Sequence, residues 1–289
     1  MKLEGIQPIS SVYLTNVERI PLSMCCIGGT AININFIQCS YSCTYCPWEA
    51  HLDTRSAQFI RLNLEVLTSS FNRYKPDIVF LNGGDFWRFD HNLKSILSKI
   101  FNAEAYKGIK VIAYPAPKST LDSMLELADY CDIVLIEIGK RSNIPFVFDI
   151  VSYVVKGKHV ELVVVGDSLN DVREVVEVLT EKLAAFSYIL PLNLILNQFD
   201  EPQIHIFIDK IRVRYPLMHT FQSKSSEYSS ILCPKCRLPV IVRQGINTIN
   251  TYLDEDCRCK FCKSKIINIG RSFCRARRKV KIPINIPIS

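Results

Sequence analysis

The sequence has little of what marks non-globular chains. Only 11 of its 289 residues are Gly and 14 are Pro, while 48% are hydrophobic, which excludes collagen-like and disordered classes. No stretch reaches the roughly 18 consecutive apolar residues of a membrane span, and the first residues lack the apolar region of a secretory signal. We therefore expect a globular, cytoplasmic protein with a substantial core and no membrane partner.

Positive charge is unevenly distributed. The net charge is +7, but residues 229–289 hold 13 Lys and Arg against three acids, so the remaining chain is weakly acidic, at −3. Basic clusters attract phosphate backbones; the alternative is a solvated surface or a match for acidic patches elsewhere on the chain. The densest basic run comprises Arg271, Arg275, Arg277, Arg278, Lys279 and Lys281.

Short apolar runs alternate with amphipathic stretches. The runs predict strands at 31–38, 77–81, 109–114, 132–138, 159–165 and 187–192. Apolar spacing of three and four predicts helices at 61–73, 91–101, 119–130, 170–183 and 202–214. Strands and helices in alternation predict an α/β fold with a parallel sheet, and six units, fewer than a complete barrel needs, indicate a partial (βα)6 TIM-like barrel.

Composition divides the chain into four predicted parts. We expect an N-terminal extension at 1–30, a core domain at 31–221, a Ser-rich linker at 222–230, and a small zinc-ribbon-like domain with a basic tail at 231–289.

The first cysteine cluster follows the first predicted strand. Cys39, Cys43 and Cys46 form a CxxxCxxC motif. Three thiolates can bind three irons of a 4Fe-4S cluster, and the missing fourth ligand leaves one iron open for chemistry. The alternatives are a zinc knuckle or three unrelated core cysteines.

With Tyr45 directly before the third cysteine, this motif resembles that of the radical S-adenosylmethionine (SAM) superfamily. The resemblance implies that the open iron binds SAM. An electron from the cluster then cleaves SAM to methionine and a 5′-deoxyadenosyl radical, which abstracts hydrogen from a substrate. It also implies an electron donor such as ferredoxin or flavodoxin.

Later strand ends extend the resemblance. Gly83, Gly84 and Asp85 resemble the family's GGE element with Asp in the last place, and the resemblance implies that they help Tyr45 to seat SAM. Glu137 and Val165 end the fourth and fifth predicted strands, where related enzymes contact SAM. The alternatives are an ordinary Gly-Gly turn, and strand-end solvation or helix capping.

The second cysteine cluster has the spacing of a zinc site. Two CxxC pairs, Cys233 with Cys236 and Cys259 with Cys262, are separated by 22 residues and can supply four thiolates to tetrahedral zinc. Cys257 is a substitute for Cys259, and an auxiliary iron-sulfur cluster is the alternative to zinc. The segment 232–266 resembles the tail of the AmmeMemoRadiSam radical SAM proteins, relatives of pyruvate formate-lyase activating enzymes.

Three functions follow from these motifs. The first is a radical SAM enzyme that abstracts hydrogen from an unknown substrate, with a protein substrate suggested by the activating-enzyme resemblance. The second is a radical SAM enzyme that modifies RNA and binds it through the zinc ribbon and the basic tail. The third, from a different class, is a non-catalytic interaction module with zinc at both clusters.

Overall fold

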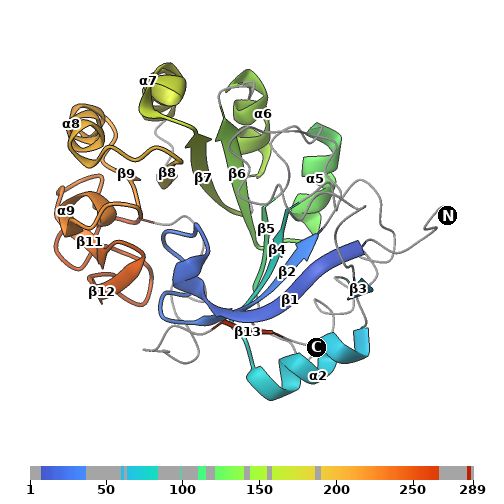
Figure 1. Ribbon diagram of the computed structural model, residues 1–289. Helices are drawn as coiled ribbons and strands as arrows, with labels where there is room; N and C mark the ends of the chain where they lie inside the picture. Colours follow the sequence, from blue (N-terminus) through green and yellow to red (C-terminus); the bar gives the residue numbers. More distant parts are fainter. Residues whose placement is uncertain are drawn as a thin grey trace.

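The computed structural model describes residues 8–36, 60–61, 64–83, 98, 110–114, 121–139, 144–154, 158–185, 190–266 and 285–287, and structural statements below refer to these ranges. They form a mixed α/β fold (Figure 1). The strands are β1 (Pro8–Asn16), β2 (Thr30–Phe36), β3 (Ile60–Arg61), β4 (Ile78–Asn82), β5 (Lys110–Tyr114), β6 (Ile133–Gly139), β7 (His159–Gly166), β8 (Leu192–Leu196), β9 (Met218–His219), β10 (Ile231–Leu232), β11 (Pro239–Gln244), β12 (Asn247–Thr251) and β13 (Asn285–Pro287). The helices are η1 (Val17–Arg19), α2 (Leu64–Tyr74), α5 (Leu121–Asp129), α6 (Ile144–Val154), α7 (Leu169–Ala185), α8 (Glu201–Arg212) and α9 (Ser226–Ser229).

One large sheet organises the molecule. Its strand order is β13-β1-β2-β4-β5-β6-β7-β8-β9, and each neighbouring pair from β2 to β9 is parallel. β1 pairs antiparallel with β2 and β13. The sheet curves, and α5, α6, α7 and α8 lie along its outer side (Figure 1). Within the described ranges the end strands β13 and β9 do not pair with each other, so the sheet is open.

The two faces of the sheet have different partners. On β7, Val160, Leu162 and Val164 belong to the core cluster that includes the buried stripe of α7, whereas Val163 and Val165 pack with β8 on the inner face. The stripe predicted for residues 170–183 is confirmed, because Val172, Val176, Leu179 and Leu183 are buried on α7. The alternation of a strand therefore separates an outer hydrophobic layer from an inner, partly polar one.

The predicted α/β fold with a parallel sheet is confirmed, but the count of six parallel strands is wrong. β9 is a seventh, and with two residues it is too short to show periodicity. The strand predicted at 187–192 is misplaced, since β8 spans Leu192–Leu196. Pro191 lacks an N–H to donate, although its carbonyl accepts from Leu162, so β8 begins after it. The antiparallel β1 was also missed.

Helix α6 is another element without a sequence prediction, because its apolar and aromatic residues mask the helical period. Val147, Ile150 and Val151 lie at three-and-four spacing and are buried in the main core cluster. The predicted helices 61–73, 119–130 and 202–214 correspond to α2, α5 and α8. The predicted helix 91–101 lies outside the described residues apart from position 98. Among the described helices, none is long and apolar enough to cross a membrane.

Residues 17–29, which we call the plug segment, pack against the inner face of the sheet. Ile20, Leu22 and Cys25 are buried in one cluster with β4 and β6 residues such as Ile78 and Ile133. The N-terminal residues predicted as an extension thus supply a strand, β1, between β13 and β2, and part of the interior. The plug fills the half of the sheet interior nearest the start of the parallel strands.

Residues 222–230, predicted as a linker, are tied to the sheet. The Gln222 side chain exchanges two hydrogen bonds of 2.7 Å with the backbone of Leu196, and residues Ser226–Ser229 form α9. The small antiparallel sheet β10-β11-β12 follows, and its Ile231, Val240 and Ile241 belong to the main core cluster. The division of the chain into separate domains stays a prediction.

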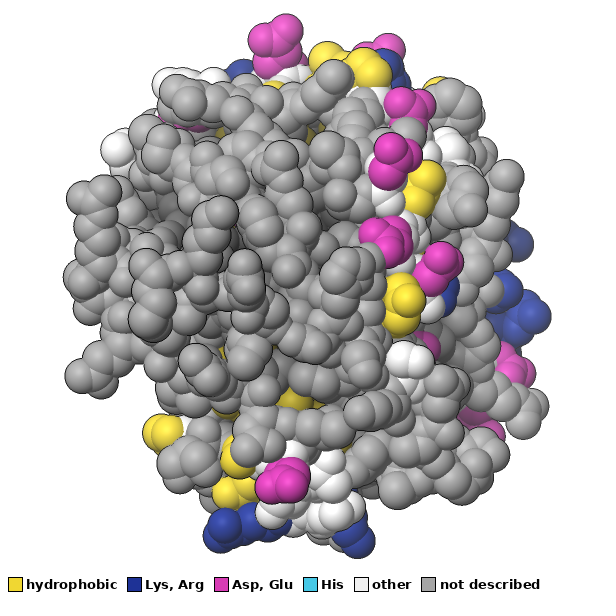
Figure 2. Space-filling model, turned by 90° about the vertical axis from the view of Figure 1, so that its right-hand side faces the viewer, with side chains coloured by type: hydrophobic (Ala, Val, Ile, Leu, Met, Phe, Trp, Pro, Cys, Tyr) yellow, Lys and Arg dark blue, Asp and Glu magenta, His cyan; other side chains and the backbone are white. Residues whose placement is uncertain are grey.

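One face of the described part carries several acidic side chains. Figure 2 views the molecule from the side on which α5 lies and shows acidic side chains among the described atoms of that face. Asp122, Glu126 and Asp129 of α5 are all exposed.

Candidate functional site

The residues of the first cysteine motif, Cys39, Cys43, Tyr45 and Cys46, lie outside the described residues, as do Gly84 and Asp85. Their neighbours are described. β2 ends at Phe36, three residues before the motif begins. Gly83 has a φ of +77°, and a Cβ at this position would lie 3.3 Å from the Phe36 carbonyl oxygen. Glycine is therefore required where the end of β4 meets the end of β2.

A cavity of about 280 Å3 lies on the inner face of the sheet, above the plug segment. Glu137 and Val165, predicted from sequence as SAM contacts, both line it. The structure thus brings together two predicted site residues from different strands. The other lining residues are Tyr13, Glu18, Arg19, Ile20, Pro21, Asn33, Phe80, Asn82, Asn193, Ile195, Phe221, Gln222 and Ile246.

Three carboxamides, which we call the amide trio, line this cavity from β2, β4 and β8. Asn33, Asn82 and Asn193 are 4%, 3% and 0% exposed. In each, one atom has no hydrogen-bond partner: Asn33 Oδ1, Asn82 Oδ1 and Asn193 Nδ2. A buried polar atom without a partner costs about 1–3 kcal/mol, so the three carboxamides lower the stability of the sheet interior.

The other atom of each carboxamide is held by the protein. Asn193 Oδ1 accepts from the Phe221 backbone N–H at 3.3 Å, and its NH2 group is buried without a partner. Asn33 Nδ2 donates to the Tyr13 hydroxyl, and Asn82 Nδ2 donates to Asn35 Oδ1 at 3.1 Å. The trio is therefore positioned before any ligand binds.

The cavity also contains carboxylates. Glu18 Oε1 accepts from the Gly28 N–H at 2.7 Å, which fixes the plug segment, and Glu18 Oε2 is buried without a partner. Glu137 lines the cavity as well, while Arg19 is exposed. Among the buried atoms without a partner on the described lining residues, three are acceptors and one is a donor.

Beneath the cavity, Glu161 of β7 anchors the plug segment. Its two oxygens accept from the Ser23 and Met24 backbone N–H groups, and His159 Nε2 lies 2.8 Å from Oε1. Cys25, His159 and Glu161 bring their ligand atoms within 4.8 Å of one another. Both carboxylate oxygens are already hydrogen-bonded, so we assign this cluster to holding the plug rather than a metal.

His219 of β9 completes the anchor from the opposite edge of the sheet. Its Nδ1 lies 3.1 Å from the Leu217 carbonyl oxygen and so carries the proton, while Nε2 accepts from the Ser23 hydroxyl at 3.0 Å. Burial lowers the pKa of His219 to about 3, and the imidazole is neutral near pH 7.

Arg243 of β11 joins the small sheet to the plug segment. Its Nη2 donates to the carbonyl oxygens of Ser23, at 2.9 Å, and Leu22, at 3.4 Å, and its guanidinium carbon lies 4.5 Å from the centre of the Phe221 ring. Burial lowers the pKa of Arg243 to about 10. Because Ile246 of the β11–β12 turn lines the cavity, the small sheet forms part of its wall.

A second candidate site lies in this C-terminal region. The Sγ atoms of four cysteines all lie within 4.8 Å of one another, with Cys233–Cys262 at 3.5 Å and Cys236–Cys259 at 3.7 Å. Zinc with bonds of about 2.3 Å to four thiolates places the sulfurs about 3.8 Å apart, so the set fits tetrahedral zinc. A hydrogen bond from Ser264 lowers the pKa of Cys262 to about 6, whereas desolvation and the neighbouring thiols raise the pKa of Cys236 to about 12, so Cys262 forms a thiolate before Cys236 does.

The two CxxC pairs have the same backbone geometry. Arg237 and Lys263, each following the second cysteine, have φ angles of 64° and 61°. Each donates its N–H to the carbonyl of the first cysteine, Cys233 or Cys259. Cys257, predicted as a substitute ligand, is not in the four-thiol group and is disulfide-bonded.

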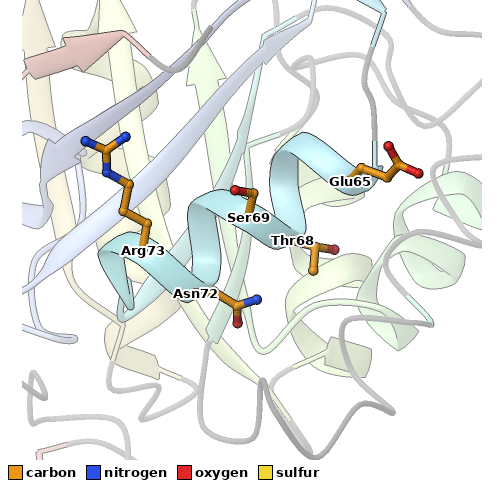
Figure 3. A pocket seen from close by; sticks show the side chains of 5 residues that line it. All are labelled: Glu65, Thr68, Ser69, Asn72 and Arg73. Carbon is orange, nitrogen blue, oxygen red and sulfur yellow. The ribbon is translucent and has the colours of Figure 1, made fainter.

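A separate hollow of about 720 Å3 runs beside α2 (Figure 3). All its described lining residues come from this one helix: Glu65, Thr68, Ser69, Asn72 and Arg73. Side chains along a single helix do not converge on a point, so we assign it no chemistry.

No family model matches the chain, and no curated protein matches it. Among solved structures, it is similar to the crystal structure of QueE from Escherichia coli, with 16% sequence identity and a TM-score of 0.43 over 72% of this chain and 91% of that chain.

Sequence reasoning missed the amide trio, Glu18 and the anchor of the plug segment. A signal existed for Asn33, because the predicted strand around it alternates at period two and so places its polar residues on one face. Nothing in the sequence brings Glu18 or Arg243 to this cavity, since both arrive through contacts between distant segments.

Proposed function

We propose that the chain is a radical SAM enzyme, with SAM seated at the mouth of the cavity where the parallel strands end. The observation that carries the proposal is the meeting of Glu137 and Val165 in one cavity, with Gly83 against the last residue of β2, three residues before Cys39. Ligands of parallel sheets bind beyond the carboxyl ends of the strands, and in the sequence the cysteine motif follows the carboxyl end of β2.

In this proposal Cys39, Cys43 and Cys46 would hold a 4Fe-4S cluster, with Tyr45, Gly84 and Asp85 beside SAM. When bound, the cluster supplies the electron that cleaves SAM to methionine and a 5′-deoxyadenosyl radical. The chain's own residues bind and shield the reactants.

Three features of the cavity serve that role. The left-handed backbone at Gly83 lets a ligand approach closely, and the Glu137 carboxylate accepts hydrogen bonds. Phe80, Val165 and Ile195 form apolar walls that exclude water from a reactive species.

The test is anaerobic reconstitution with iron and sulfide, followed by dithionite and SAM. We expect methionine and 5′-deoxyadenosine in equal amounts, measured by mass spectrometry. Cys43→Ala should lose both the brown cluster absorbance and the products, while Cys131→Ala, at a cysteine outside both clusters, should keep them. A fully loaded cluster that leaves SAM intact would contradict the proposal.

At the four-thiol site we infer zinc, on the fit of its sulfur separations. The metal would be structural, because four protein thiolates leave no open position. Metal analysis of the reconstituted protein should give one zinc besides the iron, and Cys236→Ser should lose the zinc alone. Additional iron in place of zinc would indicate an auxiliary cluster. The reductant in this scheme is a ferredoxin or flavodoxin.

A further inference from the structure

One buried arginine touches three parts of the cavity wall. Arg243 Nη2 donates to the Ser23 carbonyl oxygen of the plug segment at 2.9 Å, and Nη1 donates to the Ile246 carbonyl oxygen at 3.2 Å. Its guanidinium carbon lies 4.5 Å from the centre of the Phe221 ring. Phe221, Ile246 and the plug segment all line the cavity, so a shift of Arg243 would displace three parts of its wall together.

The backbone of Arg243 is held as well. Its N–H donates to the Ser230 hydroxyl at 3.0 Å, and its carbonyl oxygen accepts from the Ser229 hydroxyl at 2.9 Å. Across the small sheet it pairs with Thr248 of β12. The position of the guanidinium therefore depends on the arrangement of β11 and β12.

The four-thiol site holds the opposite end of these two strands. The first CxxC pair joins β10 to β11, and the Cys233 N–H donates to the Leu238 carbonyl oxygen at 2.8 Å, just before β11 begins. After β12, Leu253 forms a β-bridge with Cys259 of the second pair. Strands of two, six and five residues are weakly stable alone, so one metal bound by both pairs would cross-link the start of β11 to the end of β12.

We propose that metal binding at the four-thiol site orders the wall of the cavity, with Arg243 as the positioning residue that connects the two. None of the four cysteines is among the described lining residues, so the metal acts on the cavity only through β11 and β12. The coupling is reciprocal, because a ligand that requires the ordered wall also raises the affinity of the thiols for metal. This inference goes beyond the proposed function and requires no radical chemistry.

The test is amide hydrogen exchange of the full-length protein, measured by mass spectrometry on metal-free protein with and without one equivalent of zinc. The Ser23 and Met24 N–H groups are the reporters, because both donate to Glu161 and exchange when the plug segment opens. We expect zinc to slow exchange in residues 231–266 and, by about fivefold or more, in residues 17–29. Protection confined to 231–266, or no protection at all, would overturn the inference.

The Cys236→Ser variant shows whether the zinc acts at the four thiols. Zinc should protect neither region in this variant, because the site has lost one ligand. If zinc still slowed exchange in residues 17–29, the effect would come from another site and the inference would be wrong.

Two matched substitutions test the route through Arg243. In Arg243→Lys, zinc should still protect 231–266 but should slow exchange in 17–29 by less than about twofold, since lysine cannot reproduce the planar fork. Arg237 also donates to two backbone carbonyls, those of Arg212 and Val213 at the end of α8, a helix with no residue among the described lining. Arg237→Lys should therefore keep the zinc-dependent protection of 17–29. The reverse pattern would contradict the assignment, and the zinc comparison on the native protein gives an answer even if Arg243→Lys fails to fold.

SAM separates this inference from the proposed function. With the iron-sulfur cluster reconstituted, the loss of zinc in Cys236→Ser should weaken SAM binding by about fivefold or more in anaerobic calorimetry. Unchanged SAM affinity would overturn the coupling and leave the radical function. Zinc-dependent protection of the plug segment in a protein that does not cleave SAM would remove the radical function and leave the coupling.

Discussion

At the scale of single residues, buried polar groups do two separate tasks. Each side chain of the amide trio is held by one hydrogen bond and keeps one buried atom without a partner. Glu161 and His219 are instead satisfied by the plug segment, through its Ser23 and Met24. The first set lowers the stability of the protein, and the second contributes to it.

His219 makes the attachment of the plug segment sensitive to pH. Burial holds its pKa near 3 against an ordinary value of 6.5, so the unfolded chain binds a proton that the folded protein does not. The contribution of neutral His219 to the free energy of unfolding is complete above pH 6.5 and is lost as pH falls toward 3. We expect the free energy of unfolding to drop by about 2 kcal/mol more between pH 7 and pH 5 in the native protein than in His219→Asn.

Urea unfolding at each pH provides the measurement, with each protein referred to its own value at pH 7. His205, on α8, is partly exposed and has a serine partner at 2.8 Å. His205→Asn is the matched control and should retain the native pH dependence. Parallel curves for the native protein and His219→Asn would show that His219 is not the titrating group.

At the scale of elements, the small sheet β10-β11-β12 is a wall of the cavity. Arg243 reaches from β11 to the plug segment and covers Phe221, while Ile246 at the following turn lines the cavity itself. The four-thiol site closes the same sheet at its other end. A metal bound to these four thiols would therefore support the geometry of the cavity wall.

Arg243→Lys tests that connection. Lysine carries one ammonium in place of the planar fork, so it cannot reproduce the contacts to Leu22, Ser23 and the Phe221 ring. We expect a loss of about 2–4 kcal/mol in the free energy of unfolding, because the residue is fully buried. Arg258→Lys, at an exposed position of the same region, should cost less than about 0.5 kcal/mol. Equal losses in the two variants would mean that the buried contacts of Arg243 contribute no more stability than the exposed contacts of Arg258.

At the scale of the whole molecule, the two ends of the chain meet in the large sheet. β13 pairs antiparallel with β1, with Tyr13 opposite Pro287 and Thr15 opposite Asn285. Deletion of residues 285–289 would expose the backbone of β1 at the sheet edge. We expect a lower melting temperature and a concentration-dependent loss of monomer in size-exclusion chromatography.

A point variant separates pairing from side-chain effects. Ile286→Val preserves a β-branched side chain opposite Leu14 and should behave as the native protein. If the deletion also behaves as the native protein, β13 contributes nothing measurable to the edge.

Since β13 follows the basic run, a deletion of the whole tail would change both the charge and the sheet. RNA binding is therefore better tested by Arg-to-Gln substitutions.

Sequence patterns predicted the outer layer of this fold and the grouping of the four C-terminal thiols. The stripe of α7 and the apolar runs of β4, β6 and β7 are local signals, and local signals predict local structure. β9 was too short to be detected, and α6 has too few polar residues to reveal its period. The cavity depends on contacts across more than one hundred residues, such as Ser23 with Glu161, which no local pattern carries.

The plug segment has a kinetic consequence. Ile20 lines the cavity and packs against residues near the start of β4 and β6, whereas Glu137 and Val165 line it near the ends of β6 and β7. A co-substrate held at the strand ends would obstruct the passage toward the plug segment. Under the proposed function, a substrate that binds on the plug side of SAM then enters first and departs last, and SAM added beforehand slows its arrival.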